Sequence, residues 1–289
     1  MRYAVFTVSL PEYTPERAVA ILRDEGYQGV EWRVTDQKPS ADGKPGFWSG
    51  NLCTWPLSSF VEDAPRIRAL TEQAGLAMPS VGTYVNCEDL AAVERAMQGT
   101  AKLGAPQLRV GVPGYDGRSN YLKIRDRAVG QYRDVAALAK QHGLRALIEI
   151  HMGNITPSAS AMASFVSHFD PRYVGVVHDA GNMAHEGYEQ YRLGLEMLGP
   201  YLAHVHLKNA LWQSVGTRAD GSTDWRPASA PMRKGIVNLE ALLQALYQVG
   251  YEGWVSFEDF STDEPLAQRV RENLRYVKQV EQRVAGTAR

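Results

Sequence analysis

Eight short apolar runs, rich in β-branched residues, recur along the chain and alternate with amphipathic stretches. Each run has the length of a buried strand, and each amphipathic stretch has the apolar spacing that is typical of a helix. Such alternation favours parallel strands joined by helical crossovers. We expect strands at residues 3–8, 29–34, 77–84, 107–112, 145–151, 174–178, 202–207 and 253–257, and helices at 15–25, 64–74, 90–103, 121–142, 239–249 and 263–285, with a frayed tail at 286–289.

The spacing of these units favours a closed barrel over an open sheet. Eight units in 289 residues average about 36 residues each, which fits a (β/α)8 architecture. An open doubly wound sheet is the competitor, but no GxGxxG motif follows the first strand, which argues against its dinucleotide-binding form. No linker interrupts the pattern. We therefore predict an α/β protein with one domain over residues 1–289, a single TIM barrel whose active site lies at the carboxyl ends of the strands.

The charge and cysteine content argue against several classes of protein. There are 31 basic and 32 acidic residues, so no basic excess is available to follow a phosphate backbone, and we expect no nucleic-acid partner. The two cysteines, Cys53 and Cys87, have no CxxC spacing and are expected as free thiols. The chain starts directly with a strand-like run, and no apolar stretch approaches the roughly 20 residues that span a bilayer. We expect a cytoplasmic protein without a membrane partner.

Two segments are longer than ordinary connections between strands and helices, and both carry tryptophans. Each follows an expected strand, so each is expected over the carboxyl ends of the strands, where barrels build their active sites. The aromatic content favours a role as a substrate cover. The tryptophans are Trp48 and Trp55 in residues 35–60, and Trp212 and Trp225 in residues 209–234.

Acidic residues and a histidine stand near the ends of four consecutive expected strands. These strands run apolar and then reach Glu149, Asp179, His206 and Glu258. Side chains two residues apart share one face of a strand, so groups on the interior face converge at one mouth of the barrel. Buried charges are costly unless they are paired or bound to metal, and a divalent cation relieves the repulsion among three carboxylates. The sequence therefore predicts a metal site.

The motifs at these strand ends resemble the signature of the xylose isomerase-like barrels. That superfamily contains sugar phosphate isomerases and epimerases, ketose 3-epimerases, inosose dehydratases and hydroxypyruvate isomerases. The likeness covers essentially the whole chain, and the motifs follow one another in the family's order. They are Glu149-Ile150-His151, Asp179-Ala180-Gly181-Asn182, His204-Val205-His206-Leu207-Lys208 and Phe257-Glu258.

The resemblance implies one divalent metal ion at the strand ends. His204 would lie one layer deeper than the ligand histidine. Many ketose epimerases have a histidine three residues after the strand-end aspartate, where this chain has Asn182. Three oxygens and one nitrogen favour harder ions, so manganese is expected first, with magnesium, cobalt or zinc as alternatives. The implied ligands are Glu149, Asp179, His206 and Glu258.

The resemblance also implies that Glu149 and Glu258 act as acid and base. One would remove the proton next to a substrate carbonyl, giving an enediolate, and the other would return it, so that the substrate is isomerised or epimerised. The substrate is expected to be a small sugar or a sugar-like keto compound. The candidates for contact with it are His151, His185, Lys208 and Arg109.

Three other functions are open from the sequence alone. A lyase or dehydratase acting on a cyclitol or a 3-keto-glycoside would use the same enediolate to expel a leaving group. A DNA repair enzyme resembling endonuclease IV needs several more metal ligands, and the early strands offer Glu31 but no histidine. A barrel could also bind a metabolite without turnover. Members of the superfamily often form homo-oligomers, and the sequence gives no interface signal.

Overall fold

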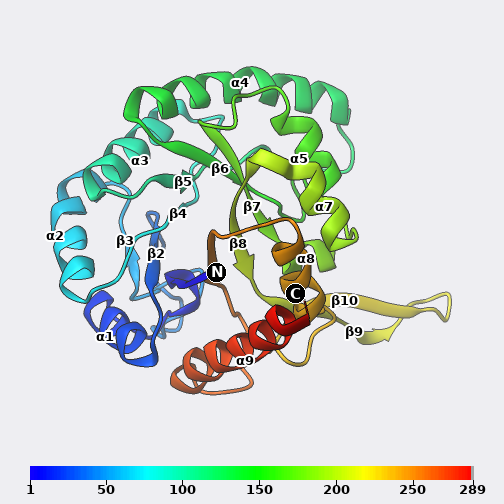
Figure 1. The fold of residues 1–289 in the computed structure, drawn as a ribbon. Helices are drawn as coiled ribbons and strands as arrows, with labels where there is room; N and C mark the ends of the chain where they lie inside the picture. Colours follow the sequence, from blue (N-terminus) through cyan, green and yellow to red (C-terminus); the bar gives the residue numbers. More distant parts are fainter. Residues whose placement is uncertain (288–289) are drawn as a thin grey trace.

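The computed structural model describes residues 1–287 and has a closed barrel of eight parallel strands inside a ring of helices (Figure 1). Neighbouring strands pair in the order β1-β11-β8-β7-β6-β5-β4-β2, and pairing of β1 with β2 closes the ring. All eight predicted strands are present, so the TIM-barrel prediction is confirmed. The barrel strands are β1 (Arg2–Phe6), β2 (Gly29–Val34), β4 (Val81–Thr83), β5 (Gln107–Arg109), β6 (Arg145–Glu149), β7 (Val174–Asp179), β8 (Leu202–Leu207) and β11 (Trp254–Phe257).

Most connections between barrel strands are helices that pack on the outside of the ring. Three predicted helices, at 15–25, 90–103 and 121–142, match the structure residue for residue. Within the described residues, no helix combines the length and the apolar character needed to cross a membrane. The helices are α1 (Pro15–Glu25), α2 (Phe60–Gln73), α3 (Leu90–Leu103), α4 (Tyr121–His142), α5 (Ala159–Val166), α6 (Ala180–His185), α7 (Tyr191–Leu198), α8 (Leu239–Gln248) and α9 (Leu266–Thr287), with short 3-10 turns η1 (Thr7–Ser9) and η2 (Gly199–Tyr201).

Local sequence signals explain where several helices begin and end. The Thr14 hydroxyl accepts a hydrogen bond from the backbone of Arg17, and Pro15 opens α1. Gly26 follows α1 with φ of 86°, a left-handed conformation that costs glycine little. The last helix differs from its predicted range of 263–285, because α9 begins at Leu266 and continues to Thr287. The predicted tail at 288–289 lies outside the described residues.

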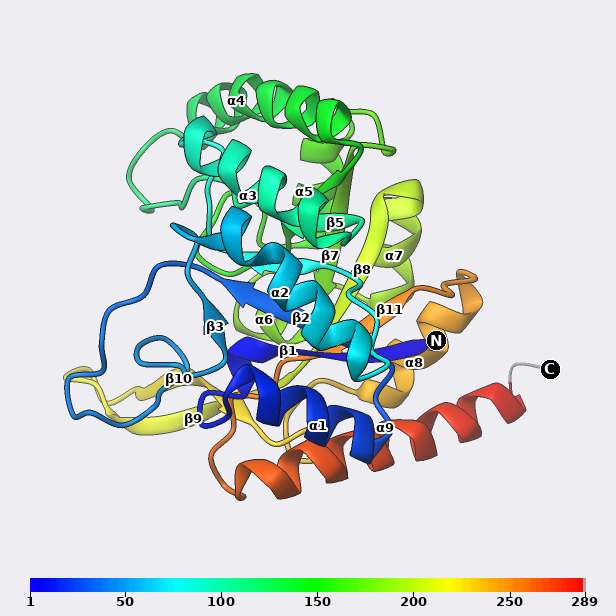
Figure 2. The same cartoon turned by 90° about the vertical axis from the view of Figure 1, so that its left-hand side faces the viewer.

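Two excursions project on the side where the strands end (Figure 2). The first lies between β2 and α2 and contains β3 (Thr54–Trp55), which pairs with β2. The second was expected as a loop, and this expectation is wrong. It contains an antiparallel hairpin of β9 (Asn209–Thr217) and β10 (Thr223–Ala230), whose side chains are mostly exposed on both faces. Because neither face is buried, the hairpin lacks the apolar alternation from which a strand is predicted.

Candidate metal centre and active site

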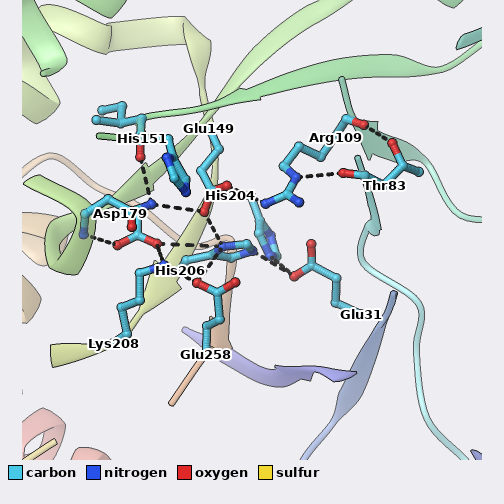
Figure 3. Close-up of polar contacts among 12 residues, drawn as sticks. Glu31, Thr83, Arg109, Glu149, His151, Asp179, His204, His206, Lys208 and Glu258 are labelled. Carbon is cyan, nitrogen blue, oxygen red and sulfur yellow. Dashed lines mark hydrogen bonds and ion pairs between the residues drawn. The ribbon is translucent and has the colours of Figure 1, made fainter. Parts of the chain in front are cut away.

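Four of the predicted site residues meet at the carboxyl end of the barrel (Figure 3). Glu149 and Asp179 are the last residues of β6 and β7, His206 lies in β8, and Glu258 directly follows β11. One donor atom from each side chain lies within 4.8 Å of the other three, and all four residues are buried. Neighbouring parallel strands end at one level, so residues distant in the sequence converge there.

His206 lies at the centre of this cluster. Its Nδ1 is 3.0 Å from Glu149 Oε1 and 3.9 Å from both Asp179 Oδ2 and Glu258 Oε2. Its other ring nitrogen, Nε2, is 3.1 Å from Glu31 Oε2. One nitrogen of the ring therefore faces three carboxylates, while a fourth carboxylate holds the opposite nitrogen.

Glu31 is a site residue that the sequence analysis did not place in the metal centre. It lies in β2, and its Oε2 also contacts His204 Nε2 at 3.0 Å. The same nitrogen of His204 lies 2.9 Å from the Ser256 hydroxyl. His204 therefore lies below the cluster, as expected. The sequence does contain a signal for this contact, because Glu31 is a charged residue within an expected strand. All six residues of that strand are buried, and a buried charge requires a partner.

Two cations neutralise part of the acidic cluster. The Arg109 guanidinium forms an ion pair with Glu149 Oε2 and donates a hydrogen bond of 2.8 Å to the carbonyl of Thr83. The Lys208 ammonium lies 2.9 Å from Asp179 Oδ2 and contacts Glu258 Oε2. The two basic residues predicted to contact substrate are thus engaged with the carboxylates of the cluster.

The pKa values in this cluster depart from their ordinary ranges because the groups are buried beside one another. Burial favours the neutral form of Glu149, but Arg109 and His206 outweigh it and hold the pKa of that carboxyl well below its usual range. Burial also opposes the charge on His206, yet Glu31 and Glu149 raise its pKa well above the ordinary value. Burial is the largest influence on Asp179 and, with Glu149 and Glu258, raises its pKa to about 6 despite Lys208. At Asp179, burial and the neighbouring carboxylates therefore outweigh the nearby Lys208 ammonium.

The remaining predicted substrate contacts, His151 and His185, both line the cavity above the cluster. His151 Nδ1 is 2.6 Å from the carbonyl oxygen of Met152. Asn182, which stands where many ketose epimerases have histidine, donates hydrogen bonds of 3.3 Å to Glu149 Oε1 and 3.1 Å to the carbonyl of Ile150. Asn182 therefore helps to fix the orientation of the Glu149 carboxylate.

The cavity has a volume of about 380 Å³, within the usual range for a small-molecule site. Its floor is polar and includes Glu149, Lys208 and Glu258, whereas part of its wall is aromatic. Both long segments line the cavity, as expected, the first through Phe47 and Trp48 and the second through Asn209, Ala210 and Ser229. Of their four tryptophans, only Trp48 is among the lining residues. The aromatic side chains of the wall are Phe47, Trp48, Tyr84 and Phe260.

A divalent ion fits the cluster by geometry and by donor chemistry. Carboxylate and imidazole ligands lie about 2.0–2.2 Å from such ions, so donors on opposite sides are separated by about 4.3 Å. The four donors lie within 4.8 Å of one another, which is close to this separation. Asp179 Oδ2 is fully buried, its close partner is the Lys208 ammonium at 2.9 Å, and it accepts no hydrogen bond from another group of the described residues. Such an atom is a ready ligand for an ion.

Known proteins share the fold and, in part, the sequence. The curated relatives include the inosose dehydratases of Mesomycoplasma hyopneumoniae, one of which is 25% identical over 126 residues, covering 42% of each chain. The match thus spans less than half the length of these relatives. Among solved structures, the apo 3-keto-D-glucoside 4-epimerase YcjR from E. coli has a TM-score of 0.72 at 14% identity, covering 96% of this chain and 99% of that one.

Two further solved structures of the same fold contain metal. The IOLI protein with a bound zinc atom has a TM-score of 0.71 at 15% identity, covering 99% of both chains. A protein from Mycobacterium smegmatis in complex with magnesium has a TM-score of 0.68 at 18% identity, covering 98% of this chain and 97% of that one. The model of the xylose isomerase-like TIM barrel family matches residues 19–280. The chain therefore belongs to the xylose isomerase-like TIM barrel family.

Proposed function

We propose that the protein is a divalent-metal-dependent isomerase or epimerase that acts on a sugar-like keto substrate. The observation that carries this proposal is the cluster of four donor residues at the floor of a cavity of about 380 Å³. Enzymes of the same fold include the ketose and keto-sugar epimerases among the solved structures. The implied ligands are Glu149, Asp179, His206 and Glu258, and manganese is the ion that we expect first, ahead of magnesium, cobalt and zinc.

The two glutamates are the proposed acid and base. The chemistry that a divalent ion supplies when bound here is positive charge beside a substrate carbonyl, which lowers the free energy of the enediolate. Glu149 and Glu258 come from strands that β7 and β8 separate, so their carboxylates reach the cavity from two sides. One carboxylate oxygen accepts the proton from the carbon next to the carbonyl, and the other glutamate returns a proton to the substrate.

The surrounding residues support these roles. Arg109 holds Glu149 Oε2, so the charge of Glu149 is balanced while Oε1 faces the cluster. Lys208 lies between Asp179 and Glu258, where its ammonium can donate to a substrate oxygen after a shift of the side chain. His151 and His185 line the cavity and are proposed to bind substrate hydroxyl groups.

A dehydratase or lyase acting on a cyclitol or a 3-keto-glycoside is the second candidate. The match to inosose dehydratases favours it. The first step is the same removal of a proton next to the carbonyl, after which a leaving group departs from the following carbon. Product analysis separates the two candidates, because isomerisation conserves the mass of the substrate whereas elimination releases water or an alcohol.

The test has a metal arm and an activity arm. Purified wild-type protein, incubated with manganese and then desalted, should retain about one equivalent of metal, and His206→Ala should lose it. Glu258→Gln should then lower kcat on a converted keto-sugar by about 100-fold or more. Glu252→Gln is the matched control, because Glu252 is exposed just before β11 at the opposite end of the barrel. Wild-type protein that binds no divalent ion, or a fully active Glu258→Gln variant, contradicts the proposal.

A further inference from the structure

We infer that the aromatic wall of the cavity is a subsite for a second ring of the substrate, so that the preferred substrate is a keto-sugar joined to a cyclic group through a glycosidic oxygen. This inference rests on the proposed function, because it takes the carboxylate cluster as the place where the keto-sugar reacts. We use the term aromatic wall for Phe47, Trp48, Tyr84 and Phe260, all of which line the cavity.

The aromatic wall is a connected cluster of rings. The ring of Trp48 lies 5.1 Å from that of Phe260 and 6.4 Å from that of Tyr84. Phe47 meets Phe260 edge to face, with the ring centres 5.2 Å apart. Each ring therefore packs against at least one other, and Tyr84 also lies beside the guanidinium groups of Arg109 and Arg33, at 4.3 Å and 5.2 Å from its ring centre. The apolar surface that these rings present to the cavity is centred on Trp48 and Phe260.

Part of this apolar surface faces solvent. Trp48 is 59% exposed and Tyr84 is 39% exposed, although both line a cavity. Large aromatic side chains exposed in a concave site gain free energy when an apolar surface covers them. The C–H faces of a sugar ring, or the face of an aryl group, can provide such a cover.

The segment that carries Trp48 is fixed at its base. Asn51 is buried and donates a hydrogen bond of 3.0 Å to the carbonyl of Val8. Gln37 and Asn51 exchange two hydrogen bonds, of 2.7 Å and 3.1 Å. Arg33 of β2 in turn donates to Gln37 at 3.1 Å. Trp48 is thus presented by a segment that is already ordered, which reduces the entropy lost when a ring binds.

The aromatic wall and the reacting groups are close together. Phe260 follows Glu258 by two residues, and the Lys208 ammonium, which contacts Glu258, lies 5.3 Å from the centre of the Phe260 ring. A ligand that contacts both the carboxylates and the aromatic wall needs an oxygen-rich end at the carboxylates and a ring that is only one linkage away. A glycoside has this construction, with the sugar oxygens on one side of the linkage and the second ring on the other.

The chain supplies a matched control for Trp48. Trp225 in β10 is 52% exposed, similar to Trp48, but it is not among the residues that line the cavity. Replacing either tryptophan by alanine removes the same atoms from an exposed position. Only the change at Trp48 should affect a ligand in the cavity.

The experiment compares the binding of phenyl β-D-glucoside and methyl β-D-glucoside to the magnesium-loaded protein by isothermal titration calorimetry. The two probes differ only in the group joined to the sugar, and neither has the ketone needed for turnover. In the wild type and in Trp225→Ala, the phenyl glucoside should bind about fivefold to tenfold more tightly than the methyl glucoside. In Trp48→Ala this preference should disappear, and Trp48→Phe, which restores a ring, should recover most of it.

Equal binding of the two probes by the wild type, or no binding of either, would overturn the inference. So would a preference for the phenyl glucoside that survives in Trp48→Ala. Far-UV circular dichroism and the Tm of each variant verify that it is folded. Because binding of these probes requires no reaction, a negative result leaves the proposed function standing. Failure of the metal and Glu258→Gln tests, in contrast, would leave the measured ring preference intact.

Discussion

Replacing Glu31 with glutamine removes the negative charge below His206 while keeping the size and shape of the side chain. Glu31 Oε2 lies 3.1 Å from His206 Nε2, and His206 Nδ1 faces the three carboxylates of the candidate metal centre. A carboxylate behind a ligand histidine fixes the orientation of the ring and the nitrogen that carries the proton. We therefore predict that Glu31→Gln weakens metal binding although Glu31 is outside the proposed ligand set.

The size of this effect follows from the type of hydrogen bond that is lost. A hydrogen bond to a charged group contributes about 1.5–3 kcal/mol, and one between neutral groups contributes about 1 kcal/mol. Glutamine can still accept from His206, so the loss is about 1–2 kcal/mol, which corresponds to about a tenfold rise in the Kd for the ion. Glu31 is fully buried, so solvent does not screen the change.

The assay is titration of metal-free protein with manganese, followed through the electron paramagnetic resonance signal of the free ion. His204→Gln is the matched control. It disturbs the same buried layer, because His204 also contacts Glu31, but it leaves the contact between Glu31 and His206 in place. This control should bind manganese with an affinity close to that of the wild type.

Two results would refute the reasoning about Glu31. If folded Glu31→Gln binds manganese as tightly as the wild type, the carboxylate does not support the ligand histidine. If His204→Gln weakens binding as much as Glu31→Gln does, the effect comes from general disturbance of the layer below the cluster. Thermal unfolding of both metal-free variants shows whether the disturbance is of similar size.

Two further predictions concern stability. Lys208→Met leaves Asp179 and Glu258 without their shared cation, so the free energy of unfolding of the metal-free variant, measured in urea, should fall by about 3 kcal/mol. Saturating magnesium should restore most of this stability. Equal stability of the metal-free variant and the metal-free wild type would contradict this prediction. His178 is buried with neither ring nitrogen hydrogen-bonded, and burial lowers its pKa from 6.5 to about 4. As the pH falls, His178 is protonated in the unfolded chain before it is protonated in the folded protein, so the stability of the wild type should decline by up to about 3 kcal/mol between pH 6.5 and pH 4. His178→Phe should show a shallower decline of the free energy of unfolding in urea. Parallel pH profiles of the two proteins would rule out His178 as the cause.

The barrel could be predicted from the sequence because its strands are buried on both faces. All six residues of β2 and all six of β7 are buried, so most of their residues are apolar, and the polar ones are few: Glu31 and Arg33 in β2, His178 and Asp179 at the end of β7. Helix α6 could not be predicted in the same way, because it has six residues and begins directly after β7. Its start depends on Asp179, whose Oδ1 accepts a hydrogen bond of 2.8 Å from the backbone of Asn182. One side chain thus ends a strand and caps a helix, and its other oxygen faces the cluster.

The four strand-end residues of the candidate site could be found because parallel strands end at one level. Glu149, Asp179 and Glu258 needed only that rule and the order of the strands, whereas the choice of His206 over His204 came from the resemblance to the family. Glu31 needed more, because the sequence separates it from His206 by 175 residues and β1 and β11 lie between their strands in the sheet. The contact therefore crosses the interior of the barrel. Its prediction requires the layer in which each inward side chain lies, which the tilt and stagger of the strands decide.

The two charged residues of β2 are a sequence signal from which buried partners could have been predicted. Glu31 and Arg33 lie two residues apart, so they share the interior face of a strand that is otherwise apolar. Neither charge would be stable there without a partner. Glu31 contacts His206 of the cluster and His204 below it, and Arg33 donates to Gln37 and Thr54 at the base of the segment that presents Trp48. This strand thus supports both ends of the cavity, the candidate metal centre through one charge and the aromatic wall through the other.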